Sequence, residues 1–417
     1  MDTTVDTPGL VVVGASLAGL RAVQSARRSG YEGPITLVGA EAHLPYDRPP
    51  LSKAYLGDQG EPDYFVTEEE LADLNVTLRL GQTATGLDTS RKLVLLGDER
   101  LPYARLIIAT GAHPRTLPSL PILPGVVTLR TLDDAQDLRT RLTPDTNVVV
   151  IGAGFIGAEI ASSASGRGAN VTVLEAAPVP LVRAVGDVVG AAISTLHARH
   201  GVRMVCEARI VGLVGETHVT GVTLDTGETI PADVVVVGIG AAPATEWLRE
   251  SGLELHERDG GIVCDEFLRT SDEDVFAAGD AVHWPNGALD ATMRLENWTN
   301  AADQGTRAGA NAVAPREQQR PYETVPYFWS DWYGHRIQFV GGAADADDVV
   351  FASGEPEGDQ FVALFRRGER VIGVATLNEP RKIMKFRRLI SKRGTWEDAQ
   401  ELLGSFAAAP DTSVPAI

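Results

Sequence analysis

Cysteine is nearly absent from this chain. The 417 residues include two cysteines, Cys206 and Cys264, which stand far apart and form no CxxC pair. This scarcity excludes a disulfide framework and a cysteine-based metal site, and isolated cysteines are typical of a reducing compartment. We therefore expect both to be small buried side chains in a cytoplasmic protein.

Long apolar runs are absent as well. The most apolar stretches are interrupted by glycines before they reach the length that spans a membrane. Residues Met1–Asp6 are acidic and lack the basic and apolar regions of a secretion signal. The sequence thus predicts a protein with no membrane partner.

Positive charge is scarce except in one window. The chain has 37 Lys and Arg against 56 Asp and Glu, a formal net charge of −19. General nucleic-acid binding is therefore not expected, because neutralising phosphates requires clustered basic residues. Residues 366–393, however, hold ten basic and two acidic residues. This concentration of positive charge in an otherwise acidic chain exceeds what solubility requires. The window is interpreted either as a docking face or as a solvated basic helix.

Metal-binding motifs are also missing. His197 and His200 stand at helical spacing, but no paired cysteines and no HExxH motif accompany them. We interpret both as surface histidines and predict no metal.

Two glycine fingerprints are the most informative features that are present. The first, GASLAG at 14–19, follows the apolar run Leu10–Val13, and the second, GAGFIG at 152–157, follows Val148–Ile151. Each opens an Ala-rich, helix-forming stretch, predicted at Leu17–Ser29 and at Phe155–Arg167, and a second strand follows at Ile35–Val38 and at Val171–Leu174. This context predicts two βαβ units whose turns and helix N-termini hold a pyrophosphate. Two bound dinucleotides indicate redox chemistry.

The duplication organises the predicted fold. We predict an α/β chain with two Rossmann-like dinucleotide-binding domains, one for FAD and one for NAD, and a small α+β C-terminal domain. The predicted boundaries are 1–112 and 244–320 for the FAD-binding domain, 113–243 for the NAD-binding domain, 321–405 for the C-terminal domain and 406–417 for a flexible tail. The strand ending at Asp280 is assigned back to the first domain.

Strand-end carboxylates distinguish the two units. Glu175 ends the second strand of the second unit, where a carboxylate can accept both ribose hydroxyls, and no Arg follows to pair with a 2′-phosphate. We therefore expect NADH rather than NADPH. The first unit departs from the pattern, because Ser16 replaces the second glycine and Ala40 stands where an acid is expected. Glu41 is the nearest substitute, and Asp280 supplies a second carboxylate at the same sheet.

Further motifs carry a family resemblance. They are PYDRPPLSK at 45–53, ATG at 109–111, LRT at 129–131, AGD at 278–280 and YFWSD at 327–331, together with the two fingerprints. With these motifs the chain resembles the FAD-dependent ferredoxin reductases of bacterial oxygenase systems over nearly its whole length. The segment ending in Lys53 is the most specific of them, since the glycine motifs are shared by many flavoproteins.

The resemblance implies roles for individual residues. Lys53 is expected beside the reactive edge of the flavin, paired with Glu159, and these two are the predicted catalytic residues. Phe155 is expected either to cover the flavin or to be part of the core. The predicted FAD contacts are Gly14, Ser16, Leu17, Ala18, Glu41, Arg48, Lys53, Ala84, Thr110, Gly111, Arg130, Asp280 and Trp298. The predicted NAD contacts are Gly152, Gly154, Phe155, Ile156, Glu159, Glu175, Gly238 and Gly240.

Missing cysteines also limit how electrons leave. Disulfide reductases of this build keep a redox cysteine pair after the first βαβ unit, where this chain has residues 45–53. The resemblance therefore implies single-electron transfer from NADH through FAD to an iron–sulfur ferredoxin that serves a cytochrome P450 or a ring-hydroxylating dioxygenase. The charge of the basic 366–393 window suits an acidic ferredoxin, and a solvated basic helix is the alternative. By the same resemblance, Trp329 and Trp332 lie at the exposed flavin edge or are simply core aromatics. The alternatives are a rubredoxin reductase, an NADH oxidase, or a flavin- and NADH-binding signalling protein similar to apoptosis-inducing factor.

Overall fold

The chain forms two compact units in a computed structural model. The structure describes residues 8–57, 60–117 and 123–407. One unit consists of Met1–Leu142 and Val236–Thr324, and the other of Thr143–Val235 and Val325–Ile417. The acidic N-terminus Met1–Asp6 and most of the predicted tail lie outside the described residues.

The first unit is built on a mixed sheet with the strand order β3-β2-β1-β6-β5-β4, and β18 also pairs with β6. Strands β1, β2, β3, β6 and β18 are parallel, whereas β5 is antiparallel to the first half of β6 and β4 is antiparallel to β5. The strands span Gly9–Val13 (β1), Ile35–Val38 (β2), Val76–Arg79 (β3), Gly86–Asp88 (β4), Leu93–Leu96 (β5), Glu99–Ile108 (β6) and Val275–Ala277 (β18). The pairing of β18 with β6 confirms that the strand before Asp280 returns to the first unit.

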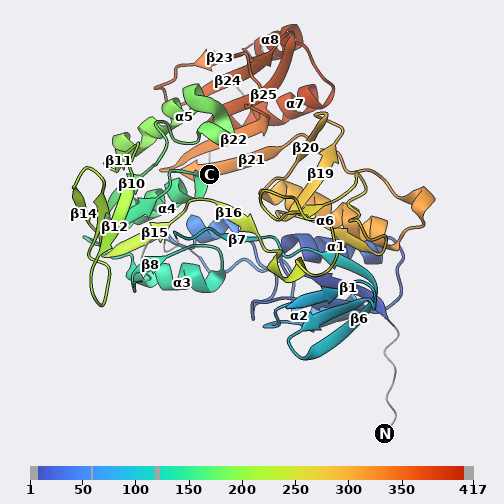
Figure 1. Cartoon of the computed structure of the whole chain (residues 1–417). Helices are drawn as coiled ribbons and strands as arrows, with labels where there is room; N and C mark the ends of the chain where they lie inside the picture. The colour runs from blue at the N-terminus through green and yellow to red at the C-terminus, as the bar shows by residue number, and fades with distance from the viewer. Residues whose placement is uncertain (1–7, 58–59, 118–122, 408–417) are drawn as a thin grey trace. The chain divides into compact units, whose positions relative to one another are not determined.

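Two helices of this unit lie side by side, α1 (Leu17–Arg28) and α6 (Trp298–Val313) (Figure 1). Two glycines of α6 make their close approach possible. A Cβ at Gly305 would lie 2.2 Å from the Ala18 carbonyl oxygen, and one at Gly309 would lie 2.2 Å from that of Ala22. Side chains at these positions would therefore push α6 away from α1 and from the fingerprint turn.

The second unit repeats the βαβ arrangement. Its parallel strands are ordered β11 (Arg203–Val205), β10 (Asn170–Leu174), β9 (Asn147–Ile151) and β15 (Val234–Val237). Helix α4 (Phe155–Gly166) follows β9, and α5 (Val182–Arg199) follows β10. Both predicted βαβ units are therefore present, and their helices and strands begin and end within one residue of the prediction.

The C-terminal part of the second unit is an antiparallel sheet with two helices. Its order is β21 (Tyr327–Trp332), β22 (His335–Gly341), β25 (Arg370–Leu377), β24 (Phe361–Arg367) and β23 (Asp348–Gly354). Buried residues of α5, such as Ile193 and Leu196, share one apolar core with Phe339, Phe361 and Phe365 of this sheet. Helices α7 (Pro380–Ser391) and α8 (Trp396–Ala407) follow, so helical structure continues slightly past the start of the predicted tail.

The crossing between the predicted domains is marked by two short strands. β7 (Ala112–Pro114) pairs antiparallel with β16 (Ala241–Pro243), at the predicted boundaries 112/113 and 243/244. The boundaries between the compact units differ from the predicted ones. The first unit ends at Leu142 instead of residue 112, and it resumes at Val236 instead of residue 244. Among the described residues, no helix combines the length and the apolar character needed to cross a bilayer.

Candidate active site

The first fingerprint turn has the geometry of a phosphate-binding turn. Gly14 has a φ of +118°, and a Cβ there would lie 2.1 Å from the Ala109 carbonyl oxygen, so only glycine fits. Ser16 is the N-cap of α1 in an extended conformation, and its side chain does not cap the helix. No acidic residue stands in the first turn, which includes Leu17 and Ala18. The first N–H groups of α1 are therefore available to an anion.

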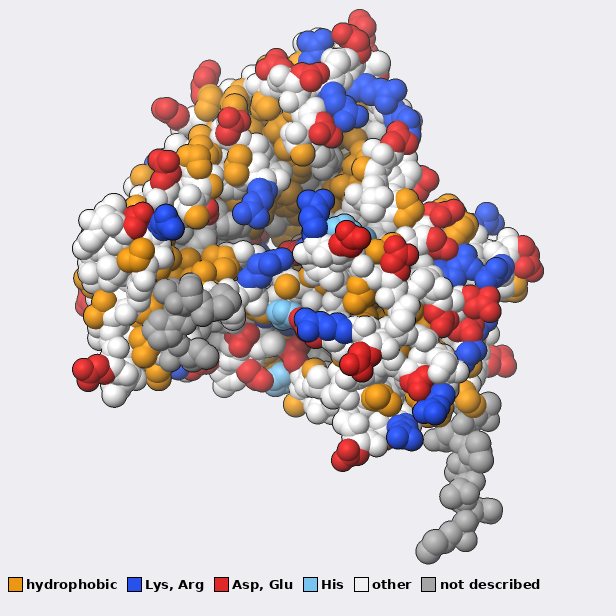
Figure 2. All heavy atoms as spheres, viewed as in Figure 1, with side chains coloured by type: hydrophobic (Ala, Val, Ile, Leu, Met, Phe, Trp, Pro, Cys, Tyr) orange, Lys and Arg blue, Asp and Glu red, His pale blue; other side chains and the backbone are white. Residues whose placement is uncertain are grey.

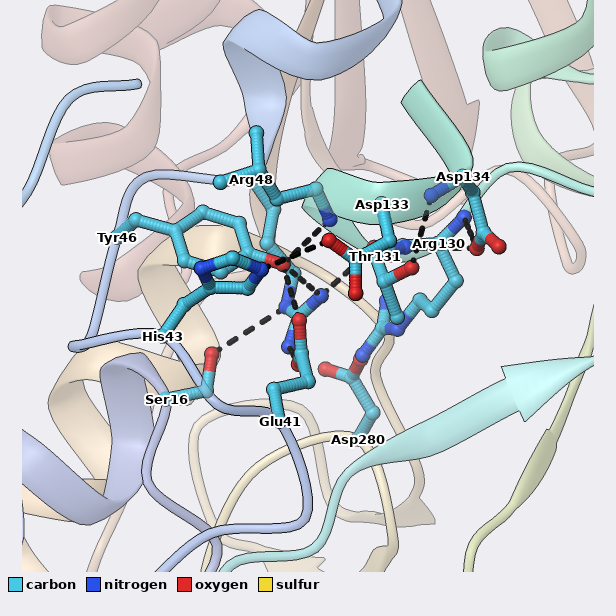
Figure 3. Close-up of polar contacts among 11 residues, drawn as sticks. Ser16, Glu41, His43, Tyr46, Arg48, Arg130, Thr131, Asp133, Asp134 and Asp280 are labelled. Carbon is cyan, nitrogen blue, oxygen red and sulfur yellow. Dashed lines mark hydrogen bonds and ion pairs between the residues drawn. The ribbon is translucent and has the colours of Figure 1, made fainter. Parts of the chain in front are cut away.

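Arg48 joins this turn to the strand-end carboxylate (Figure 3). Its Nε donates to Ser16 Oγ at 3.3 Å, its Nη1 donates to the Arg130 carbonyl oxygen at 2.6 Å, and its Nη2 forms an ion pair with Glu41. A guanidinium group beside a helix N-terminus is suited to hold a pyrophosphate. Glu41 lies beside this turn through its ion pair with Arg48, and its role in place of an acid at position 40 stays a prediction.

Tyr46 is a member of this cluster that sequence reasoning missed. Its hydroxyl donates to Glu41, accepts from Arg48 Nη1 at 3.0 Å and accepts from the Leu132 N–H at 2.9 Å. Burial raises the pKa of this phenol, so it stays protonated and keeps donating to the carboxylate. The only available signal was its place in the motif at 45–53.

A second carboxylate and a second guanidinium group meet beside Arg48. Arg130 Nη2 lies 3.0 Å from Asp280 Oδ2, and a Cβ at Gly111 would lie 3.3 Å from the same Arg130 nitrogen. Thr110, between these elements, donates through Oγ1 to the Ala244 carbonyl oxygen at 2.8 Å. The set of two cations, two carboxylates and an open helix N-terminus fits FAD, because the cations suit its pyrophosphate and the carboxylates suit its hydroxyl groups.

Lys53 follows the short 3-10 helix Pro49–Ser52, and its Nζ donates to the Pro49 carbonyl oxygen at 3.2 Å. Nearby, Asp47 Oδ1 accepts from Trp298 Nε1 at 2.7 Å. Burial raises the pKa of the Asp47 carboxyl, although the Trp298 hydrogen bond and the charge of Lys53 oppose the shift. Ala84, the remaining predicted FAD contact, packs against the core of the first unit.

Behind Asp280 lies a cluster of ionisable groups. Arg294 Nη1 donates to the Asp280 carbonyl oxygen at 2.8 Å, and its Nε donates to Asp259 Oδ2 at 2.9 Å. His256 and His283 also lie within 3.2 Å of this carboxylate. Their rings are stacked, 4.0 Å between centroids and 7° between planes. Because a metal binds imidazole in the ring plane, two parallel rings in this arrangement do not share one ion, and the cluster is better described as a hydrogen-bonded support of the Asp280 loop.

The second fingerprint repeats the turn geometry in the other unit. Gly152 has a φ of +102°, and a Cβ at Gly157 would lie 2.1 Å from the Gly152 carbonyl oxygen. Gly154 is the N-cap of α4, and a Cβ there would meet nothing within 4 Å. Ile156 beside it is 50% exposed. The residues therefore fit NAD, since a pyrophosphate could approach the backbone at Gly154 without obstruction.

Glu175 is held in place at the end of β10. Its Oε2 accepts from the Ala153 N–H and its Oε1 from the Ala177 N–H, each at 2.8 Å. A carboxylate fixed in this way suits two ribose hydroxyls and repels a 2′-phosphate. The other two predicted NAD contacts, Gly238 and Gly240, follow β15 and belong to the first unit.

Glu159 is a buried carboxylate in α4. It is 4% exposed, and Oε1 accepts a hydrogen bond from the Ser330 hydroxyl. Phe155, one turn earlier, packs on Phe328 at 4.6 Å between ring centroids. Phe155 is thus in contact with the apolar core of its unit. Lys53 and Glu159 belong to different units, and their pairing stays a prediction.

Two further predictions were wrong in part. His197 is 1% exposed rather than on the surface, because α5 packs against the C-terminal sheet, whereas His200 is exposed as expected. Cys264 is buried, but Cys206 is only half-buried. Trp332 is a fully buried core residue, while Trp329 is partly exposed and contacts the Arg336 guanidinium group.

Known proteins resemble the chain over nearly its full length. Residues 8–305 match the family described as pyridine nucleotide-disulphide oxidoreductase, and residues 327–403 match the reductase C-terminal family. Rhodocoxin reductase of Rhodococcus erythropolis is 38% identical, over 92% of this chain and 89% of its own length. The benzene 1,2-dioxygenase system ferredoxin–NAD(+) reductase subunit of Pseudomonas putida is 35% identical, over 91% and 92%.

Solved structures agree with these relatives. Putidaredoxin reductase, in its covalent complex with putidaredoxin, superposes with a TM-score of 0.89 at 32% identity, covering 97% of this chain and all of the other. This match confirms the predicted α/β class with two Rossmann-like domains and a small C-terminal domain. The chain belongs to the pyridine nucleotide-disulphide oxidoreductase family and, within it, to the flavin-dependent ferredoxin–NAD(+) reductases of oxygenase systems.

Proposed function

We propose that this enzyme oxidises NADH, with FAD as its prosthetic group, and reduces an iron–sulfur ferredoxin that supplies a cytochrome P450 or a ring-hydroxylating dioxygenase. The observation that carries the proposal is the pair of glycine turns, each with an uncapped helix N-terminus and a strand-end carboxylate. FAD, when bound, accepts a hydride and releases electrons one at a time. The names of the relatives favour this function over an oxidase or a signalling protein.

The protein's own residues have separate tasks in this function. In the first unit, Arg48 and Arg130 would hold the pyrophosphate of FAD, and Glu41 and Asp280 would accept its hydroxyl groups. In the second unit, Glu175 would select NADH over NADPH by holding the ribose hydroxyls. Lys53 and Glu159 are the groups we assign to the reacting edge, where a fixed lysine and a fixed carboxylate orient donor and acceptor.

Helix α7 provides a docking face for the ferredoxin. Lys and Arg side chains gather over this helix (Figure 2), and Arg381, Lys385 and Arg388 are exposed there. An acidic carrier would be attracted to this face, with an encounter rate that falls as salt rises. The cytoplasm is the proposed location, supported by the scarcity of cysteine.

An anaerobic titration tests the redox function. FAD-loaded protein should be bleached by one equivalent of NADH, and the reduced protein should then reduce two equivalents of an oxidised [2Fe–2S] ferredoxin, since each NADH carries two electrons. Faster reoxidation by oxygen than by any ferredoxin would instead indicate an oxidase. A protein that retains no flavin would refute the proposal altogether.

A charge reversal tests the docking face. Lys385→Glu should lower kcat/KM for ferredoxin about threefold or more at low ionic strength and leave the reduction of ferricyanide by NADH unchanged. Arg209→Glu, an exposed arginine in the same unit outside the basic window, is the matched control and should change neither. Equal effects of both substitutions would show that only the net charge of the protein matters.

A further inference from the structure

One face of α4 is joined to strand β21 of the C-terminal sheet within the second unit. The joined positions of α4 are four and three residues apart, which places them on the same face of the helix. Two contacts are with β21 itself, an aromatic pair of Phe155 with Phe328 and a side-chain hydrogen bond of Glu159 with Ser330. The third is with Tyr333, the residue after β21, whose N–H donates to Ser162 Oγ at 2.7 Å. A strand that follows Glu159 by some 170 residues therefore meets the turn of α4 on which this carboxylate lies.

The hydrogen bonds at Ser330 have a fixed direction. Trp332 Nε1 donates to Ser330 Oγ at 2.8 Å, and an indole N–H can only donate. The oxygen of Ser330 is thus the acceptor in that bond, and its own hydrogen is directed to Glu159 Oε1. Ser330 and Trp332 alternate with outward residues along β21, so their side chains point to the same side of the strand.

These groups are shielded from water. Ser330 and Trp332 are fully buried, and Glu159 is 4% exposed. The far side of the Trp332 ring packs on the buried ring of His197, 5.3 Å between centroids, which fixes the position of the indole. In a buried site a carboxylate needs hydrogen-bond donors, and a donor whose direction is fixed also determines the rotamer of the carboxylate.

We propose that Ser330, oriented by Trp332, is a positioning residue that sets the rotamer of the Glu159 carboxylate for hydride transfer from NADH. The inference rests on the proposed function, in which Glu159 lies at the reacting edge. The C-terminal part of the second unit then contributes to the reduction of the flavin through strand β21 as well as to the docking of the electron acceptor through helix α7.

Single-turnover reduction of the FAD-loaded enzyme by NADH tests the proposal. Ser330→Ala should slow this step about tenfold or more with little change in the Kd for NADH, and Ser330→Thr should restore most of the rate because it keeps the hydroxyl. Trp332→Phe keeps the ring on His197 but removes the N–H, so a smaller loss, about threefold, is expected. Ser162→Ala is the matched control, since its hydroxyl joins α4 to Tyr333, the residue after β21, instead of to Ser330.

A double-mutant cycle distinguishes positioning from general loosening of the structure. In a Glu159→Gln background, Ser330→Ala should have almost no further effect, because Ser330 acts through that carboxylate. The crystal structure of Ser330→Ala should in addition show the Glu159 carboxylate rotated from its original position. An equal loss in both backgrounds, or an unmoved carboxylate, would overturn the proposal. If Glu159→Gln alone leaves the rate unchanged, the catalytic role of Glu159 in the proposed function fails, and the crystal structure still decides whether Ser330 positions it.

Discussion

Acid should destabilise this enzyme through one buried histidine. His197 of α5 is 1% exposed, and its Nδ1 lies 2.7 Å from the Tyr333 hydroxyl. Its Nε2 is buried and has no hydrogen-bond partner among the described residues. Burial, with a smaller contribution from the charge of His200, lowers the pKa of His197 to about 4. A proton on this ring would leave a buried N–H without an acceptor.

The sign and size of the effect follow from the two pKa values. The unfolded chain binds this proton with an ordinary histidine pKa of about 6.5 and the folded protein only near pH 4, so the unfolded state binds more protons between these values. The contribution of neutral His197 to the free energy of unfolding is therefore complete above about pH 6.5 and is lost as the pH falls through 4. The loss amounts to about 2 kcal/mol at pH 5 and about 3 kcal/mol in total.

The assay compares variants, so that other titrating groups cancel. The free energy of unfolding of the FAD-loaded protein is measured by urea denaturation at pH 7.5 and pH 5, with circular dichroism as the signal. His197→Gln should lose about 2 kcal/mol less than the original protein between these pH values. His200→Gln, an exposed histidine one turn along α5, should retain most of the original pH dependence. If His197→Gln loses as much stability in acid as the original protein, the argument from burial is refuted.

Three other variants, one of them a double substitution, test the cofactor sites. Glu175→Ala combined with Ala176→Arg should raise the ratio of kcat/KM for NADPH to kcat/KM for NADH about tenfold or more, because a cation replaces the carboxylate that repels the 2′-phosphate. Steady-state kinetics with both nucleotides measure this ratio. Gly14→Ala should lower the free energy of unfolding by about 2 kcal/mol or more, as measured by thermal denaturation. The reason is that the φ of +118° at Gly14 and its close approach to a carbonyl oxygen leave no room for a side chain. Gly166→Ala, at an open position in α4, is the control and should not lower the free energy of unfolding. Tyr46→Phe should weaken FAD binding about tenfold in equilibrium dialysis, because it removes a donor to Glu41 and an acceptor for two N–H groups; an unchanged Kd would show that Tyr46 does not support the site.

The parts of the fold that sequence patterns predicted are those fixed by neighbouring residues. An apolar β-branched run, a glycine that needs a positive φ and an Ala-rich stretch lie within about ten residues of one another at Gly14 and again at Gly152. Strand, turn and helix follow from these local preferences, so the predicted bounds agree closely with β1, α1, β9 and α4.

What the sequence did not reveal depends on contacts between distant segments. The hydrogen bond from Ser330 to Glu159 joins residues 171 positions apart in the sequence. Neither a serine nor a glutamate indicates by its type which distant residue it contacts. His197 was interpreted as a surface histidine because no metal-binding motif accompanies it. Its burial depends on the C-terminal sheet, whose aromatic side chains cover this side of α5.

The segment after the first βαβ unit explains how one fold serves different electron acceptors. Members of this family are described as disulphide oxidoreductases, yet the two cysteines of this chain, Cys206 and Cys264, come long after residues 45–53, and Cys264 is buried. In place of a redox cysteine pair, residues 45–53 supply Tyr46 and Arg48 to the cluster proposed to hold FAD and end in Lys53 after a short 3-10 helix. Sulfur at this position would carry a pair of electrons to a disulfide, whereas polar and cationic side chains only hold the flavin and tune its charge. Without a cysteine pair in this segment, a separate acceptor that takes electrons from bound FAD, such as the proposed iron–sulfur partner, fits this chain better than a disulfide substrate.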